Sequence, residues 1–142
     1  MTRPPFPILV LAMLLPGPAA AQGEMKRLGD CAACVIENAR HAGAQLTAVD
    51  LTRGTLRDVD LTGANLSLAR LDGAVLERVR LDGADLGGAS LVGARLVDVT
   101  LTGADLSGAV LEGAVLTRTD LEGAHTCNTQ MPDDTMANGG CR

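Results

Sequence analysis

Aromatic side chains are almost missing from this sequence. Its 142 residues include no Trp, no Tyr and a single Phe, Phe6. Aromatic residues are normally the largest fillers of a folded core, so any core here must be built from Leu, Val and Ala. The length corresponds to one domain of ordinary size.

Positive charge is also scarce. The chain has 12 Lys and Arg against 17 Asp and Glu, a formal net charge of -5. Nucleic acids and anionic membranes are usually bound through basic patches. The acidic balance therefore argues against both as partners and leaves an unidentified protein as the partner to expect.

Apolar runs long enough to span a membrane, which takes roughly 20 residues, are absent. The apolar run that follows Arg3 covers residues 6–15, and three Ala residues at 19–21 come after it. This order is typical of a signal peptide, predicted over residues 1–21 with cleavage after Ala21. The first Cys, Cys31, lies too far from that site to carry a lipid. We expect a periplasmic or secreted protein without a membrane anchor.

What the sequence does contain is Leu at every fifth position. The uninterrupted series is Leu46, Leu51, Leu56, Leu61, Leu66, Leu71, Leu76, Leu81, Leu86, Leu91, Leu96, Leu101, Leu106, Leu111, Leu116 and Leu121. On an α-helix five residues advance about 500°, so these side chains would point in all directions. On a straight strand they would alternate between two faces. Neither element alone could bury them.

The pattern fits a chain that turns a corner after every pentad. The Leu and the residue two places before it lie on the same side of a short extended segment. Residues at that second position, such as Ala64, Val79 and Ala104, are small or β-branched. Two of the five residues then point inward, and Gly near the corner allows a tight turn.

A slower period gives the number of sides. At every fourth pentad the inner small position holds Val59, Val79, Val99 and Thr119. Four pentads per turn make a coil of 20 residues with a square section, and such coils stack about 4.8 Å apart. The predicted fold class is an all-β solenoid of about 4 to 5 coils.

Three stretches carry a recognisable motif: Ala64-Asn65-Leu66, Ala84-Asp85-Leu86 and Ala104-Asp105-Leu106. They resemble the A(D/N)Lxx signature of the pentapeptide-repeat family. The resemblance implies a right-handed quadrilateral β-helix. We expect the repeats over residues 34–124, between an N-terminal cap at 22–33 and a C-terminal cap at 125–142.

Four cysteines flank the predicted solenoid: Cys31, Cys34, Cys127 and Cys141. The two ends are about 20 Å apart at the usual strand spacing, whereas bridged Cα atoms lie within about 7 Å. The predicted disulfides are therefore Cys31–Cys34 and Cys127–Cys141. A redox or zinc role for the Cys31-x-x-Cys34 motif is the alternative, although the chain lacks a βαβ unit and only His41 is near enough as a further ligand.

Catalytic groups are few. His41 takes an inward Leu position and is expected to be a hydrogen-bonded cap residue. His125 falls one coil beyond Asp105 and near Ser107, but no nucleophile-elbow motif or oxyanion hole accompanies them. We predict no catalytic residue, no metal and no cofactor.

Outward residues stack in columns. One column alternates in sign through Asp58, Arg78, Asp98 and Arg118. Opposite charges at strand spacing should pair with each other. We interpret this column as a structural ladder that fixes the register of the coils.

Two other surfaces are candidates for binding. An acidic corner gathers Asp82, Asp85, Asp105, Asp120 and Glu122, with Arg80 beside them. It is weakly similar to the DNA-like surface of cytoplasmic pentapeptide-repeat proteins that act on DNA gyrase. The other surface is flat and uncharged, and the candidate interface residues on it are Leu68, Gly87, Gly88, Ser107 and Gly108, beside Ser67. Such a face loses little side-chain entropy on docking.

The sequence thus predicts an exported, non-catalytic pentapeptide-repeat protein that serves as a structural or protein-binding scaffold. One alternative is an acidic DNA mimic that inhibits a topoisomerase such as gyrase. A second alternative is a thiol oxidoreductase that uses Cys31 and Cys34. The fold does not decide among them, because one scaffold can host several functions.

Overall fold

The computed structural model describes residues 31–141 of the protein. The predicted signal peptide at 1–21 and most of the predicted N-terminal cap at 22–33 lie outside the described residues. The described part contains strands and turns, and within it no helix could cross a membrane.

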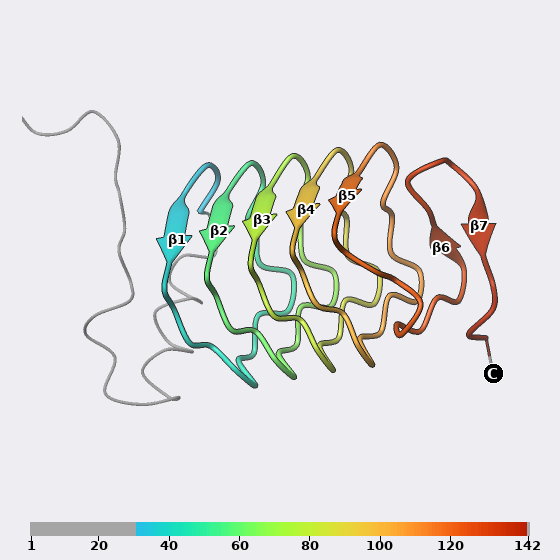
Figure 1. Cartoon of the computed structure of the whole chain (residues 1–142), viewed down its shortest axis with the longest axis horizontal. Helices are drawn as coiled ribbons and strands as arrows, with labels where there is room; N and C mark the ends of the chain where they lie inside the picture. The colour runs from blue at the N-terminus through green and yellow to red at the C-terminus, as the bar shows by residue number, and fades with distance from the viewer. Residues whose placement is uncertain (1–30, 142) are drawn as a thin grey trace, which may run out of the picture.

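One side of the molecule is a parallel sheet of five short strands. These are β1 (Val35–Glu37), β2 (Thr55–Arg57), β3 (Val75–Glu77), β4 (Arg95–Val97) and β5 (Val115–Thr117), which lie side by side in that order (Figure 1). Each residue pairs with the one 20 positions later, as Ile36 does with Leu56. The 20-residue period in the sequence is therefore the length of one coil.

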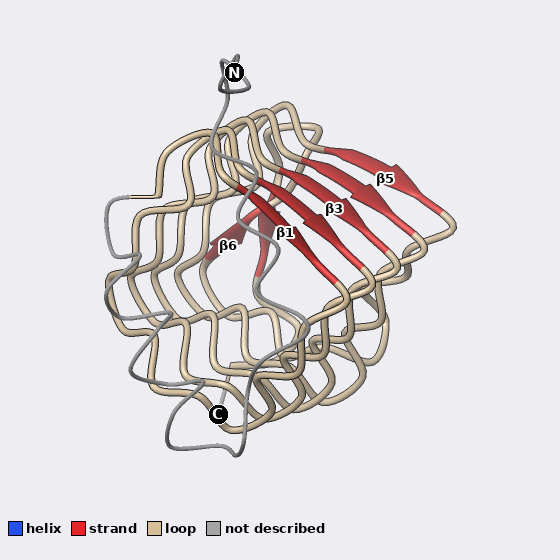
Figure 2. Ribbon diagram, turned by 90° about the vertical axis from the view of Figure 1, so that its left-hand side faces the viewer, coloured by secondary structure: helices blue, strands red, loops and turns tan. Residues whose placement is uncertain are grey.

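The other sides of each coil stack in the same register through single bridges, such as Arg40↔Asp60, Gln45↔Asn65 and Asp50↔Arg70. Seen along the axis, the coils superimpose as a tube with the five-stranded sheet on one side (Figure 2). This confirms the predicted class of an all-β solenoid with four-sided coils.

The Leu column forms the core. The Leu side chains at every fifth position from Leu51 to Leu111 are at most 2% exposed, and the smaller inward residues Ala64 and Ala84 are at most 1% exposed. A fully buried Leu stabilises the fold by about 1.5 to 3 kcal/mol relative to an exposed one. Aliphatic side chains fill the tube from Leu46 to Leu111, so we look for a functional site on the outer surface.

The corners explain the motif before each Leu. The carboxylate of Asp60 accepts hydrogen bonds from the Thr62 N–H at 3.0 Å and the Thr62 hydroxyl at 2.6 Å. Asn65 accepts the same two bonds from Ser67. An Asp or Asn that bonds to the backbone two residues on stabilises a local turn. The residue after the turn has a positive φ, which is 66° at Gly63, a conformation that Gly adopts without a steric cost.

The first coil begins earlier than predicted. Cys31 occupies the Leu column, is 3% exposed, and its N–H donates to the Asp50 carbonyl at 3.2 Å. Cys31 and Cys34 therefore both belong to the first coil, whose backbone register is already formed at residue 31.

The last coil also continues beyond the predicted boundary at Ala124. His125 and Gln130 still form parallel bridges with Asp105 and Val110. Thr129 is fully buried, because its hydroxyl donates to the Leu106 carbonyl at 2.7 Å. The chain then closes in an antiparallel hairpin of β6 (Thr129–Gln130) and β7 (Met136–Ala137), seen at the C-terminal end in Figure 1.

Candidate functional site

Both ends of the described chain carry a disulfide. Cys31 is bonded to Cys34, with Cα atoms 5.3 Å apart, and Cys127 to Cys141, with Cα atoms 4.7 Å apart. These are the pairings that the sequence predicts. Cys31 is also buried in the Leu column, whereas a redox-active cysteine must be accessible to its substrate.

The second disulfide fastens the hairpin to the end of the tube. The Gly140 N–H donates to the Thr126 carbonyl at 3.2 Å. A Cβ atom at Gly140 would lie 2.9 Å from the Thr126 nitrogen, so only Gly allows this close approach. The bridge and the contact together hold the loop against the side of the last coil that contains His125.

Asp105, Ser107 and His125 line a shallow depression beside this loop, together with Cys127 and Gly140. The Ser107 N–H donates to the Asp105 carboxylate at 2.9 Å. Hydrogen bonds from the Ser107 side chain and backbone, more than the charge of His125, lower the pKa of Asp105. Ser107 thus bonds to Asp105, as the equivalent residues do in the other corner turns. A catalytic triad would instead need a hydrogen bond between Ser107 and His125.

His41 lies in the first coil at an inward Leu position and is 2% exposed. Among the described residues no three His, Cys, Asp or Glu side chains are grouped so that they could hold a metal ion.

The charged column forms two separate ion pairs. Arg78 binds both oxygens of Asp58, at 2.7 and 3.0 Å, and Arg118 binds both oxygens of Asp98, at 2.6 and 2.9 Å. These hydrogen bonds lower the pKa of Asp58 and of Asp98. Arg78 acts on Asp98 only through its charge. Each guanidinium group forms a bidentate pair with one carboxylate. The column therefore consists of two separate pairs, whereas the sequence suggests a continuous ladder.

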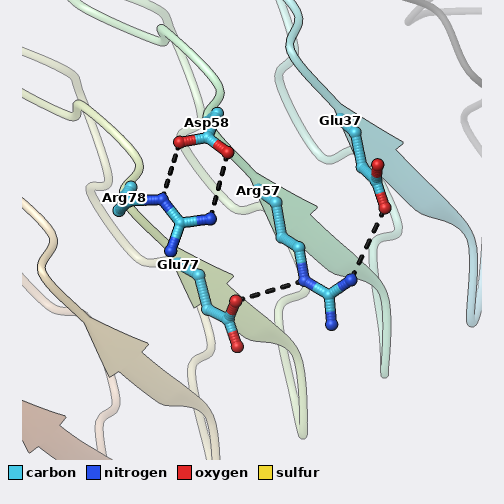
Figure 3. A network of polar contacts seen from close by, with 5 residues as sticks. All are labelled: Glu37, Arg57, Asp58, Glu77 and Arg78. Carbon is cyan, nitrogen blue, oxygen red and sulfur yellow. Dashed lines mark hydrogen bonds and ion pairs between the residues drawn. The ribbon is translucent and has the colours of Figure 1, made fainter.

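A second charge network lies beside this column and was not predicted. Arg57 on β2 is 3.5 Å from Glu37 on β1 and 3.1 Å from Glu77 on β3 (Figure 3). Stacking the sequence in rows of 20 residues would have placed these three side chains in one column. With Asp58 and Arg78 they give the region of the first three strands a polar surface on which both Arg side chains are paired with carboxylates.

The carboxylates of the acidic corner are bonded to the solenoid itself. Asp82 accepts hydrogen bonds from the Thr100 hydroxyl at 2.8 Å and the Thr102 N–H at 3.1 Å. Asp85 and Asp120 accept the N–H groups of Gly87 and Glu122. These oxygens stabilise corners, which reduces what they can offer to a partner.

The flat face centres on Leu68. This residue is 60% exposed, and its φ of 61° lies in the left-handed region that disfavours Leu. A Cβ atom at Gly88, one coil on, would lie 2.8 Å from Leu68 Cδ2. Leu68 therefore lies along the corner over Gly88, with Gly108 in the same column and Gly87 and Ser107 in the neighbouring one.

The family model described as "Pentapeptide repeats (8 copies)" matches the sequence over residues 30–67, 60–96 and 94–125. The protein belongs to the pentapeptide-repeat family. None of the curated proteins has a matching sequence.

Solved structures with a similar fold include pentapeptide repeat proteins. A pentapeptide repeat protein from the Arabidopsis thaliana thylakoid lumen is similar over 69% of this chain and 68% of its own, with 30% identity and a TM-score of 0.65. QnrB1, a plasmid-mediated fluoroquinolone resistance protein, is similar over 66% of this chain and 60% of its own, with 19% identity and a TM-score of 0.54. The second likeness shows the fold alone.

Proposed function

We propose that this pentapeptide-repeat protein is an exported, non-catalytic scaffold that binds a partner protein through the flat face around Leu68. The observation that carries this is Leu68 itself, a large apolar side chain that is 60% exposed at a φ of 61°. A left-handed non-Gly residue costs roughly 1 to 2 kcal/mol. Gly88 and Gly108 occupy the equivalent position in later coils, where Gly adopts a positive φ without this conformational cost.

Export is supported by two features besides the signal-like sequence at residues 1–21. All four cysteines are paired in disulfides, and disulfides persist mainly in oxidising compartments outside the cytoplasm. The similar Arabidopsis protein comes from the thylakoid lumen. A periplasmic or extracellular location fits both.

The binding role is supported over catalysis by the geometry around Ser107, His125 and Asp105, whose contacts are those of a corner turn. It is supported over DNA mimicry by the acidic corner, whose carboxylates bond to the solenoid's own backbone.

The test replaces Leu68 with a residue that suits the corner. Asn is well tolerated at positive φ, so Leu68→Asn keeps the backbone and removes the apolar contact. Ala48→Asn is the matched control, because Ala48 is exposed in the same column with a φ of 59°. A variant such as Gly88→Glu is unsuitable, since its Cβ would collide with Leu68.

Each protein is immobilised with its disulfides intact and exposed to an envelope extract. We expect one protein to be retained by the parent and by Ala48→Asn and lost with Leu68→Asn. Equal retention by all three would contradict a binding role for Leu68.

A further inference from the structure

The outer edge of β5 is unpaired among the described residues. Inside the sheet each strand bonds to the next coil: the Ala94 carbonyl accepts the Val115 N–H at 2.8 Å, and the Asp98 N–H donates to Thr117 at 3.0 Å. The equivalent groups one coil on are the Ala114 carbonyl and the Arg118 N–H. No such partner exists for them in the part of the chain described, and neither β6 nor β7 contacts β5.

The bridges between coils are interrupted directly after this strand and resume at His125. Arg40, Asp60, Arg80 and Thr100 form consecutive bridges, but the series stops before Asp120. Thr119 stands where earlier coils have Val, and its side-chain oxygen accepts the Val99 N–H at 3.2 Å. At this corner the side chain of Thr119 therefore supplies a contact to the preceding coil.

The core is open at the same place. Leu116, Leu121 and Ala124 are only partly buried, whereas Leu96 and Leu101 are at most 2% exposed. Val115, on the outer face of β5, is 52% exposed. The hairpin and the Cys127–Cys141 disulfide close the end of the tube beside His125 but not the part beside β5.

The charges around this edge are negative. Glu112 precedes β5, and Asp120 and Glu122 follow it, all three exposed. Arg118 is the nearby cation, and both its bonds go back to Asp98. A second copy paired edge to edge would bring these carboxylates toward their own equivalents, which is unfavourable. A basic partner would complement them.

We propose that the edge of β5 binds an extended segment of a partner protein that has alternating apolar side chains and flanking Lys or Arg. The segment adds as a further strand, a recognised way for proteins to bind peptides. Its backbone bonds to the Ala114 carbonyl and the Arg118 N–H. Its inward side chains cover Leu116 and Leu121, and its basic residues lie near Glu112 and Glu122. An exposed strand edge that is left open would otherwise invite aggregation.

The test uses a labelled synthetic peptide, acetyl-Lys-Val-Thr-Val-Lys-Val-Lys-amide, titrated into the disulfide-bonded protein and followed by fluorescence anisotropy. The double variant Glu112→Gln, Glu122→Gln removes two negative charges. Its matched control, Ala42→Lys with Thr47→Lys, changes the net charge by the same amount at exposed positions of the first coil. A peptide with N-methylated backbone at alternate residues lacks the donors for strand addition.

We expect the first double variant to weaken binding roughly five-fold at low salt, an effect of the size of two exposed ion pairs, and the control to leave binding unchanged. The N-methylated peptide should not bind, and NMR shifts should centre on Leu116 and Arg118. Leu68→Asn should bind the peptide like the parent, which separates this site from the flat face.

Three results would overturn the proposal. One is equal binding of the N-methylated peptide, and another is an equal loss in both double variants, since either would mean attraction by net charge alone. The third is a concentration-dependent dimer in sedimentation with the Arg118 amide protected, because a second copy would then occupy the edge.

Discussion

Strands β3 and β5 have nearly the same sequence, Val75-Leu76-Glu77 and Val115-Leu116-Thr117, and very different surroundings. Leu76 is 1% exposed between two neighbouring coils, whereas Leu116 is only partly buried with one. In a solenoid each repeat contacts only its neighbours, so the stability of a repeat depends on how many it has. The same pentad is therefore core in the middle of the tube and surface at its end.

The largest expected effect comes from shortening the equivalent Leu in both strands. Leu76→Ala should destabilise the fold by about 2 to 5 kcal/mol, because it leaves a cavity enclosed on both sides. Leu116→Ala should cost roughly half as much or less, since the site is already open. Urea unfolding of the two variants measures the difference, and equal losses would show that β5 is as enclosed as β3.

The two disulfides offer a comparison between the ends. Cys127 and Cys141 close a loop with a sequence separation of 14, whereas Cys31 and Cys34 are separated by 3. Replacing Cys127 and Cys141 with Ser should cost about 3 kcal/mol in the chain-entropy model. The same change at Cys31 and Cys34 should cost less through this mechanism. Thermal unfolding of the two double variants tests this order, and the reverse order would contradict it.

The charged column links coils in pairs through Asp58–Arg78 and Asp98–Arg118. Asp98→Arg places an Arg between Arg78 and Arg118 and removes the bidentate pair. We expect a lower Tm at low salt, with part of the loss restored by adding Arg118→Asp, which re-forms the pair in the opposite sense. A single variant with the parent's Tm would refute a structural role for this column.

The corner turns should produce a small pH dependence. Hydrogen bonding, mainly from the Thr62 side chain, lowers the pKa of Asp60 in the fold. Because the folded pKa is below the unfolded value of about 3.9, the turn stabilises the protein above that pH and loses its effect as the pH falls through the folded pKa. Asp60→Asn keeps the acceptor, as Asn65 does naturally, and should reduce the loss of Tm between about pH 5 and about pH 3. An unchanged acid dependence would contradict this contribution.

The repeat made the core predictable, because a Leu every five residues leaves one way to bury all of them. The ends were harder to predict, since the backbone continues its register after the pattern of side chains is lost. Thr126 breaks the Leu series, yet His125 and Gln130 still pair with the preceding coil. The hydroxyl of Thr129 can be buried there only because the Leu106 carbonyl accepts its hydrogen bond.

The outer surface was predictable only in part. Stacking by 20 residues placed Asp58 with Arg78. It could not show that Arg78 would bind one carboxylate through two guanidinium nitrogens, Nε and Nη2. The exposed Leu68 was visible in the sequence, whereas its position over Gly88 needed the three-dimensional structure. The open edge of β5 left no mark in the pattern, because Leu116 and Leu121 continue the series without a change.

Backbone hydrogen exchange at one position of the corner tests the contrast between inner and outer coils most directly. The N–H groups of Asp58, Arg78 and Asp98 donate to the next coil at 2.9 to 3.0 Å, and Arg118 has no such acceptor among the described residues. We predict slow exchange at the first three and fast exchange at Arg118 in the free protein. Slow exchange at Arg118 would show that its edge is already covered, and would contradict the account of an open strand at the end of the solenoid.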